Sequence, residues 1–344
     1  MTHPVRWGVI GTGGIARAFA RDLTLTSSGE IVAVGSRTIQ SAERFGEQFA
    51  IPHRHASYED LVADPDVEAV YVATPHPLHF ANAMLTLGAG KHVLVEKPLA
   101  MNAAEARELV QTARTAGLFL MEGMWTRFVP HIAEIRRLLA DGALGQIVTV
   151  TADHGQWFAA DPTHRLFAPE LGGGALLDLG IYPVAFASMV LGRPDRIVAL
   201  IDPASTGVDG QTSMLFGYPN GAHALLTCTS AAKSPTRAAI IGTEARIEID
   251  PDFYTPTSFT LTPRDGDPTR VAPRNHGVGL RHEADEIARC IRDGLLESPL
   301  MPLDESISIM ETMDMVLAQA RARDRHDDPS NGRACKPATP KPSM

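Results

Sequence analysis

Lys97 lies near the end of the stretch KHVLVEKP (91–98), in which a short apolar run is followed by two charged residues and a proline. A run of this length predicts a strand that is buried on both faces of a sheet. In an open parallel sheet, ligands bind in the crevice outside the carboxyl ends of the strands. We therefore expect Glu96 and Lys97 to contact a bound ligand. The alternative is a lysine exposed at a strand end, with no role beyond solvation.

Two further groups that could do chemistry lie in GGGALLDLGIYPVAFASMVLG (172–192). The apolar composition predicts a buried helix over this stretch. Asp178 and Tyr182 are four residues apart, so they share one face of that helix. Pro183 removes a backbone hydrogen bond and is expected to kink the helix, so that the two side chains diverge slightly. The alternative is that Tyr182 is a core residue whose hydroxyl is satisfied locally.

A glycine-rich turn near the N-terminus predicts a dinucleotide site. The predicted strand VRWGVI (5–10) is followed by GTGGIA, which fits the pattern GxGxxG/A, and by a helix to about residue 25. The first glycine permits a tight turn, the second lets the backbone approach a pyrophosphate, and the small third residue lets the helix pack on the strand. The N-terminus of the helix then binds the phosphate. The residues expected to contact the cofactor here are Gly11, Thr12, Gly13, Gly14 and Ile15.

The second predicted strand, IVAVGSR (31–37), indicates which dinucleotide is bound. Sites for NAD place an Asp or Glu at the end of this strand, where it binds the ribose 2′-hydroxyl. This chain has Ser36 and Arg37 instead, and a hydroxyl with a planar guanidinium suits a 2′-phosphate. We therefore expect NADP rather than NAD. The alternative is an exposed arginine that only begins the next helix.

Polar residues also follow the next strand, VEAVYVATP. Thr74, His76 and His79 lie at its carboxyl end, so we expect them to contact the cofactor or the substrate. A metal site is not expected, because the two histidines are three residues apart among prolines and have no cysteine partner.

The length of 344 residues predicts two domains. Strands and helices alternate over 1–123, which predicts a doubly wound parallel sheet of the Rossmann type. Strands dominate 124–326 and are joined by short turns, which predicts an α/β domain with an open, mostly antiparallel sheet. Residues 327–344 are rich in Pro, Ser and Lys and are expected to be disordered. Trp125, Arg127 and Phe128 follow the last strand of the first domain, so we expect them to line the cleft between the domains, with Trp125 and Arg127 near the cofactor.

Composition excludes several classes of protein. The net charge of −9 provides no overall basic surface for nucleic acid or an anionic membrane. Three scattered cysteines without CxxC spacing argue against a disulfide framework and a zinc site, and they suit a reducing cytoplasm. No signal peptide is read at the N-terminus, and no continuous apolar run approaches roughly 18 residues, so no membrane span is expected.

In combination, these motifs resemble the Gfo/Idh/MocA oxidoreductases over nearly all of residues 4–325. The resemblance rests on GTGGIA, on EKP (96–98), on WTRF (125–128) and on GGGALLDLGIY (172–182), in this order. MEGMWTRFVP and LGGGALLDLGIYPV are most similar to the family's diol dehydrogenases and NADP-dependent sugar dehydrogenases. The chain departs from these relatives near 277–286, where Leu280 and His282 replace aromatic residues, so its preferred substrate could differ.

The resemblance implies Lys97 and Tyr182 as a catalytic pair, with Asp178 in support. It implies a polyhydroxy substrate, an aldose or a cyclic diol, and a homo-oligomer formed through the open sheet.

A lysine ammonium within about 4–6 Å of a tyrosine favours the phenolate, so we expect the pKa of Tyr182 to be lowered. Two alternatives remain: a glycosidase of this family that keeps and recycles NAD, and a non-catalytic nucleotide sensor. The residues expected to contact substrate are Trp125, Phe128, His154, Asp178 and Tyr182.

Overall fold

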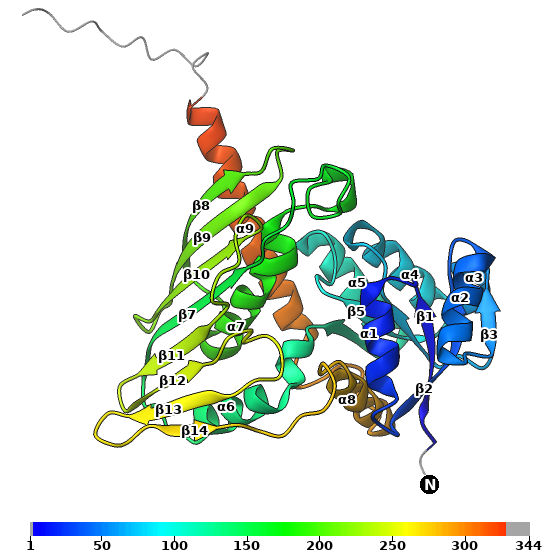
Figure 1. Ribbon diagram of the computed structural model, residues 1–344, viewed down its shortest axis with the longest axis horizontal. Coiled ribbons are helices and arrows are strands. Elements are labelled where there is room, and N and C mark those ends of the chain that lie inside the picture. Colours follow the sequence, from blue (N-terminus) through cyan, green and yellow to red (C-terminus); the bar gives the residue numbers. More distant parts are fainter. Residues whose placement is uncertain (1–2, 328–344) are drawn as a thin grey trace, which may run out of the picture.

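The computed structural model describes residues 3–327 and has two parts, each built on its own sheet (Figure 1). The first sheet is parallel with strand order β3-β2-β1-β4-β5-β6, the doubly wound arrangement expected from the sequence. Its central strands are buried on both faces, which explains their continuous apolar runs. The strands are β1 Val5–Ile10, β2 Gly29–Gly35, β3 His53–His55, β4 Ala69–Val72, β5 His92–Glu96 and β6 Leu120–Gly123.

Two helices of the first part begin at residues whose side chains cap them. The side chains of Ser57 and Asn102 each accept a hydrogen bond from a backbone N–H in the first turn of the helix that follows. The helices are α1 Gly14–Leu23, α2 Ile39–Phe49, α3 Tyr58–Val62, α4 His79–Gly88 and α5 Ala103–Ala116.

The second sheet has the order β14-β13-β12-β11-β7-β10-β9-β8. All neighbouring pairs are antiparallel except β7 and β10, so the expected mostly antiparallel sheet is confirmed. Buried and exposed residues alternate along β12 and β10, as in a sheet with one covered face. The strands are β7 Ile147–Gly155, β8 Arg196–Pro203, β9 Asp209–Gly217, β10 His223–Thr229, β11 Ala238–Gly242, β12 Ala245–Ile249, β13 Phe259–Pro263 and β14 Thr269–Val271.

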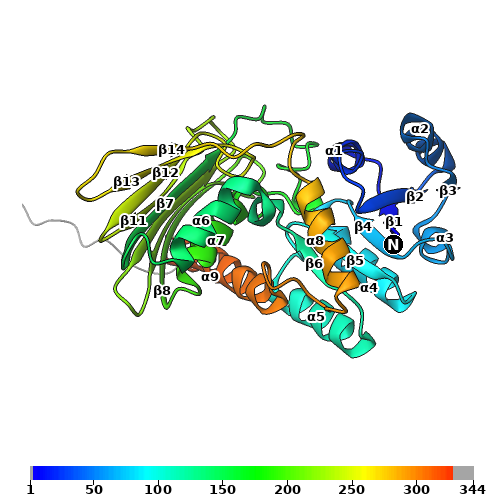
Figure 2. The ribbon, with the colours of Figure 1, turned by 90° about the horizontal axis from the view of Figure 1, so that it is seen from below.

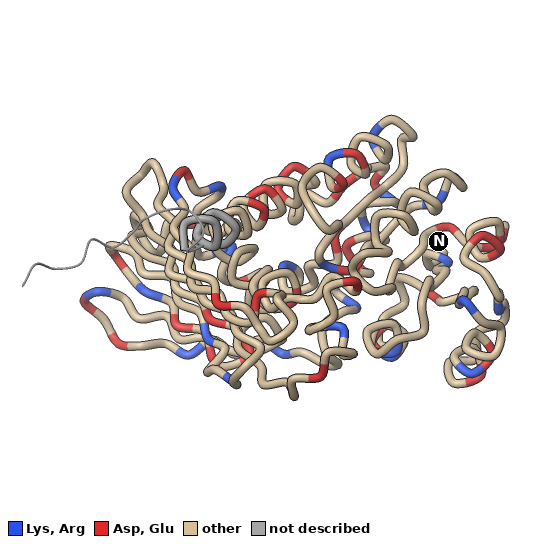
Figure 3. The backbone as a smooth tube through the Cα atoms, turned by 90° about the horizontal axis from the view of Figure 1, so that it is seen from above, with Lys and Arg blue, Asp and Glu red and all other residues tan. Residues whose placement is uncertain are grey.

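Helices fill the space between the two sheets. Helices α6 (Pro130–Ala140), α7 (Ile181–Leu191) and α9 (Leu303–Asp327) lie on the side of the second sheet that faces the first part (Figure 2). The segment Pro169–Leu191 is long and apolar enough to cross a membrane by composition alone, but 78% of its most apolar window is buried inside the protein. It is therefore a core segment in this fold. Over the described residues, the positions of acidic and basic residues are interspersed along the backbone in both parts (Figure 3).

The chain returns to the first part near its end. Helix α8 (Arg281–Arg292) packs against α1, and Asp22 on α1 accepts hydrogen bonds from the backbone N–H groups of Val278 and Gly279. This contact joins residues more than 250 positions apart, which no local pattern could indicate. The short edge strands β3 and β14 were also not predicted, because three residues each are too few for an apolar period.

Candidate active site

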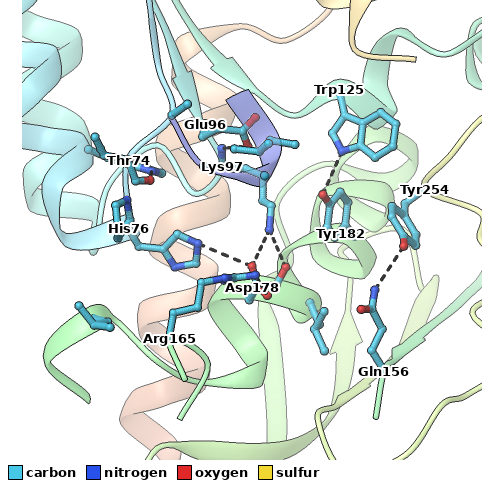
Figure 4. Close-up of a pocket in the computed structure, with 18 of the residues that line it drawn as sticks. Thr74, His76, Glu96, Lys97, Trp125, Gln156, Arg165, Asp178, Tyr182 and Tyr254 are labelled. Carbon is cyan, nitrogen blue, oxygen red and sulfur yellow. Dashed lines mark hydrogen bonds and ion pairs between the residues drawn. The ribbon is translucent and has the colours of Figure 1, made fainter. Parts of the chain in front are cut away.

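A cavity of about 510 Å³ lies at the carboxyl ends of β4 and β5, between the two parts (Figure 4). Its wall includes the glycine turn on one side and the helical segment that carries Asp178 and Tyr182 on the other. It is thus located where open α/β sheets bind ligands. The residues predicted from sequence that line it are Gly13, Gly14, Ile15, Thr74, His76, His79, Glu96, Lys97, Trp125, His154, Asp178 and Tyr182.

Asp178 is the centre of the charged groups in this cavity. Its Oδ1 lies 2.9 Å from Nζ of Lys97, and its Oδ2 lies 3.0 Å from Nη2 of Arg165. Burial by itself raises the pKa of Asp178, but Lys97 and Arg165 hold it well below its usual range. Burial likewise lowers the pKa of Lys97, yet Asp178 outweighs it and the pKa lies well above its ordinary value. Both groups are therefore charged at neutral pH.

Tyr182 lies beside this charged group. Nζ of Lys97 is 4.9 Å from the centre of the Tyr182 ring, and the indole N–H of Trp125 donates to the Tyr182 hydroxyl at 2.9 Å. Lys97 and Trp125 both lower the pKa of Tyr182, but burial outweighs them and raises it to about 12. The expectation of a lowered pKa was wrong for the free protein, because it counted the lysine and left out the cost of burying a phenolate.

Tyr182 belongs to an aromatic wall formed with His154 and Tyr254. The His154 ring stacks on Tyr254 at 4.4 Å, and the Tyr182 ring lies 4.8 Å from Tyr254. The side-chain amide of Gln156 lies within hydrogen-bond distance of both His154 and the Tyr254 hydroxyl. Burial lowers the pKa of His154 to about 4, so the imidazole is neutral. The wall offers flat apolar faces with polar tips, which suits a ring that bears hydroxyl groups.

The glycine turn has room for a phosphate. Gly11 has φ +102°, and a Cβ there would meet the carbonyl oxygen of Ala73 at 2.8 Å, so this position requires glycine. A Cβ at Gly13 or Gly14 would meet no protein atom within 4 Å. The space beside the N-terminus of α1 is therefore open, as a bound pyrophosphate requires.

Ser36 and Arg37 follow directly after β2, at the carboxyl end of the strand next to the glycine turn. Ser36 is buried, and its backbone N–H donates to His55 on β3. Arg37 is exposed, so its guanidinium is free to meet a ligand from solvent. These residues do not line the 510 Å³ cavity; a dinucleotide would reach them along the sheet edge.

The two histidines after β4 have different surroundings. Both ring nitrogens of His79 face backbone carbonyls, of Pro98 at 2.7 Å and of Thr74 at 2.8 Å, so this ring ties two loops together. His76 lies 3.6 Å from Oδ1 of Asp178, and burial with the charge of Lys97 lowers its pKa to about 3. Glu96 accepts a hydrogen bond from the hydroxyl of Tyr71 behind the cavity wall.

The only cluster of potential metal ligands found among residues 3–327 is elsewhere. It consists of His53, Asp64 and Asp66, around edge strand β3. None of the three lines the cavity.

The structure does not bring Arg127 and Phe128 to the cavity. Arg127 is buried and forms an ion pair with Glu305 on α9 at 2.8 Å, so it joins the helices of the second part. Phe128 packs in the core. Leu280 and His282 also lie outside the cavity wall, Leu280 in the core and His282 paired with Asn275. Sequence order placed Arg127 and Phe128 near the cleft but could not indicate which way each side chain points.

Arg165, Gln156 and Tyr254 are cavity residues that the sequence did not reveal. Arg165 and Gln156 belong to the long irregular segment between β7 and the next helical turn, and Tyr254 lies in the loop before β13. Such residues have no periodic pattern around them. The one available signal is the length of the first segment, since long ordered loops are often functional.

The expected helix over 172–192 is interrupted. A π-helical turn, Leu176–Gly180, precedes α7, and Pro183 lies in the first turn of α7. The Asp178 carbonyl accepts a hydrogen bond from Nζ of Lys97 at 2.8 Å. The three glycines before the turn lie outside the helix. The interruption of the expected helix therefore lies before Pro183, at the π-helical turn.

Comparisons with known proteins agree with this geometry. Residues 5–124 match the family model described as "Oxidoreductase family, NAD-binding Rossmann fold", and residues 132–248 match the GFO/IDH/MocA C-terminal domain. The chain is 39% identical over 319 residues to trans-1,2-dihydrobenzene-1,2-diol dehydrogenase of Mus musculus, covering 90% of this chain and 95% of the mouse protein. For the Homo sapiens protein of that name, identity is 38% over 321 residues, with 91% and 96% covered.

Two solved structures are similar over the whole fold. The aldose-aldose oxidoreductase of Caulobacter crescentus, solved with glycerol, has a TM-score of 0.84 and 27% identity, covering 93% of this chain and 98% of that one. KijD10, a 3-ketoreductase of Actinomadura kijaniata solved with NADP and TDP-benzene, has a TM-score of 0.81 and 27% identity, covering 92% and 97%. With both domains matched and relatives close to 40% identical along most of their length, the chain belongs to the GFO/IDH/MocA family of oxidoreductases.

Proposed function

We propose that this protein is an NADP-dependent dehydrogenase that transfers hydride between a hydroxyl-bearing carbon of a sugar or cyclic diol and the nicotinamide. The observation that carries the proposal is the meeting of Lys97, Asp178 and Tyr182 in one cavity that also reaches the glycine turn. The names of the relatives support both substrate classes, a dihydrodiol in one case and an aldose in another.

In this proposal Tyr182 moves the proton. Oxidation of a secondary alcohol releases a hydride, which the nicotinamide accepts, and a proton, which a base must take. The raised pKa of Tyr182 makes it a proton donor at neutral pH in the free protein, the role needed for carbonyl reduction. In the oxidising direction its pKa has to fall in the complex, and the fixed charge of Lys97 favours that change.

Lys97 and Asp178 position the reacting groups. Asp178 fixes the ammonium of Lys97 through two oxygens, which leaves its third proton available for the substrate oxygen. Arg165 neutralises the other oxygen of Asp178. The aromatic wall of His154, Tyr182 and Tyr254 holds the substrate ring in place.

The preference for NADP rests on Ser36 and Arg37. A carboxylate at the end of β2 would repel a 2′-phosphate, whereas the Ser36 hydroxyl and the Arg37 guanidinium are both donors. The NADP bound to KijD10 is consistent with this preference.

The free thiols of Cys228 and Cys290 support the expectation of a reducing, cytoplasmic setting.

The outer face of the second sheet supports the expected homo-oligomer. Val198, Leu215 and Leu225 lie side by side on β8, β9 and β10, and 44–64% of each side chain is exposed. Leu200 is exposed on the same side of β8 as Val198. A contiguous apolar face of this kind suits contact with a second copy of the chain.

A substrate panel tests the proposed function. Pentoses, hexoses, inositols and trans-dihydrodiols are each incubated with NADP or NAD, and absorbance of the reduced nicotinamide is followed. We expect net NADPH formation with at least one polyhydroxy substrate and much slower formation of NADH. Turnover of a glycoside without net reduction of either cofactor would contradict the proposal in favour of the hydrolase.

A further inference from the structure

The π-helical turn Leu176–Gly180 carries Asp178. Specific residues contact or constrain the backbone at both ends of this turn. The N-terminal end is held by Asp209 on β9, whose Oδ2 accepts the backbone N–H of Leu176 at 2.5 Å. Gly174 lets the carboxyl group approach, since a Cβ there would lie 2.2 Å from Oδ1 of Asp209. The turn is therefore fixed to the second sheet at the residue where it starts.

The turn also packs closely on β10. A Cβ at Gly180 would lie 2.8 Å from Sγ of Cys228. Glycine at this position allows the wider π-helical turn to lie against the strand. Single π turns are rare within helices and occur often at functional sites.

Pro183 limits which donors the backbone carbonyls at the C-terminal end of the turn can bind. A π-helical register pairs a carbonyl with the N–H five residues later, and an α-helical register with the N–H four residues later. Pro183 is five residues after Asp178 and four residues after Leu179. It has no N–H, so it cannot bind the Asp178 carbonyl in the π register or the Leu179 carbonyl in the α register. The carbonyl of Asp178 instead accepts Nζ of Lys97 at 2.8 Å.

We propose that Asp209 and Pro183 are positioning residues: Asp209 holds this turn in its π register, and Pro183 leaves the Asp178 carbonyl without a backbone donor in that register, so that Asp178 presents both its carbonyl and its carboxylate to Lys97. In the π register the partner of the Asp178 carbonyl is Pro183, which has no N–H to donate, so the carbonyl is left for Lys97. The Asp209 anchor keeps the turn from rewinding to the α register, in which the backbone N–H of Tyr182 would bind that carbonyl. Residues of the stretch GGGALLDLGIYP thus fix the position of the Lys97 ammonium, which belongs to the first part. The catalytic consequence rests on the proposed function, whereas the effect on Lys97 does not.

Pro183→Ala tests the proposal because it restores a backbone donor at this position. The pKa of Lys97 is measured in the cofactor-free protein by NMR of ¹³C-methylated lysines, alongside kcat and the Kd of NADP. We expect the Lys97 pKa to fall, kcat to fall about tenfold, and Kd to stay unchanged, as for the loss of one hydrogen bond to a charged group. Pro130→Ala is the matched control, because Pro130 is the first residue of α6, where a missing N–H costs nothing.

A second pair of variants tests the anchor. Asp209→Ala should lower kcat and the Lys97 pKa like Pro183→Ala, whereas Asp209→Asn keeps an acceptor for Leu176 and should retain most of the activity. A lower melting temperature with unchanged kcat and Lys97 pKa in both Pro183→Ala and Asp209→Ala would overturn the proposal and leave a structural role only. The two proposals can fail separately. If the wild-type protein shows no dehydrogenase activity but the Lys97 pKa still falls in Pro183→Ala, the proposed function is refuted and this inference is supported.

Discussion

The ammonium group of Lys97 binds two oxygens of Asp178, the backbone carbonyl at 2.8 Å and carboxylate Oδ1 at 2.9 Å. Lys97 follows β5 of the first part, and Asp178 lies in the π-helical turn of the second. This single pair therefore joins the two parts at the point where Tyr182 lies.

Asp178→Asn is expected to destabilise the protein, because it leaves the buried ammonium of Lys97 without its counter-charge. Breaking a buried pair in this way costs about 3–5 kcal/mol in the free energy of unfolding, which denaturant titration measures. The depressed pKa of Asp178 means that its contribution is complete above the usual carboxyl range and is lost only as pH falls through the much lower folded value. The loss should therefore be constant between about pH 5 and 9.

Glu134→Gln is the control for that measurement, since the Glu134–Arg137 pair is exposed on α6. No measurable change is expected from it. An equal effect of the two substitutions would show that the Lys97–Asp178 pair is not specially stabilising.

Arg37→Ala is expected to weaken binding of NADP and not of NAD. A hydrogen bond between charged groups contributes about 1.5–3 kcal/mol, or roughly ten- to one-hundred-fold in Kd. Calorimetric titration with both cofactors measures the change. Arg246→Ala, an exposed arginine on β12, should alter neither value. Equal losses for NADP and NAD would refute the role given to Arg37.

The pH dependence should differ between the two directions of the reaction. Oxidation requires the phenolate of Tyr182, and its pKa is raised to about 12 in the free protein. The value of kcat/KM reports ionisations of the free enzyme, so for oxidation it should rise up to about pH 10 without a plateau. For reduction, which uses the phenol, kcat/KM should be flat over the same range. A plateau in the oxidative profile at about pH 8 would assign the base to another group.

Leu225→Glu is expected to shift the protein toward a smaller oligomer, because it places a charge in the apolar row formed with Leu215 and Val198. Size-exclusion chromatography with light scattering measures the mass. Leu25→Glu is the matched control: Leu25 is exposed to a similar extent but lies in the first part, after α1. Unchanged mass in Leu225→Glu would contradict assembly through this sheet.

Much of the first part could be predicted from sequence because its signals are local. The strand predicted over 5–10 has those bounds in the structure, and GTGGIA forms the turn between β1 and α1. Buried parallel strands also give apolar runs that are hard to mistake.

The features of the site that the sequence did not predict depend on the direction of side chains and on contacts between residues far apart in the chain. Arg127 was expected at the cofactor and instead forms an ion pair with Glu305, far along the chain. Arg165 and Tyr254 reach the cavity from irregular loops, which carry no periodic signal. The pKa of Tyr182 depends on burial that only the folded protein reveals. The expected disorder of 327–344 falls, beyond residue 327, outside the described residues.

The most direct test of the central claim is the effect of Tyr182→Phe on kcat, with Tyr218→Phe as the matched control. Tyr218 also has a buried hydroxyl, but it lies outside the cavity. We expect Tyr182→Phe to lower kcat by about 10²-fold or more, as for the loss of a general acid–base, with the Kd of NADP unchanged and Tyr218→Phe fully active. A Tyr182→Phe enzyme that keeps its full kcat would contradict the account.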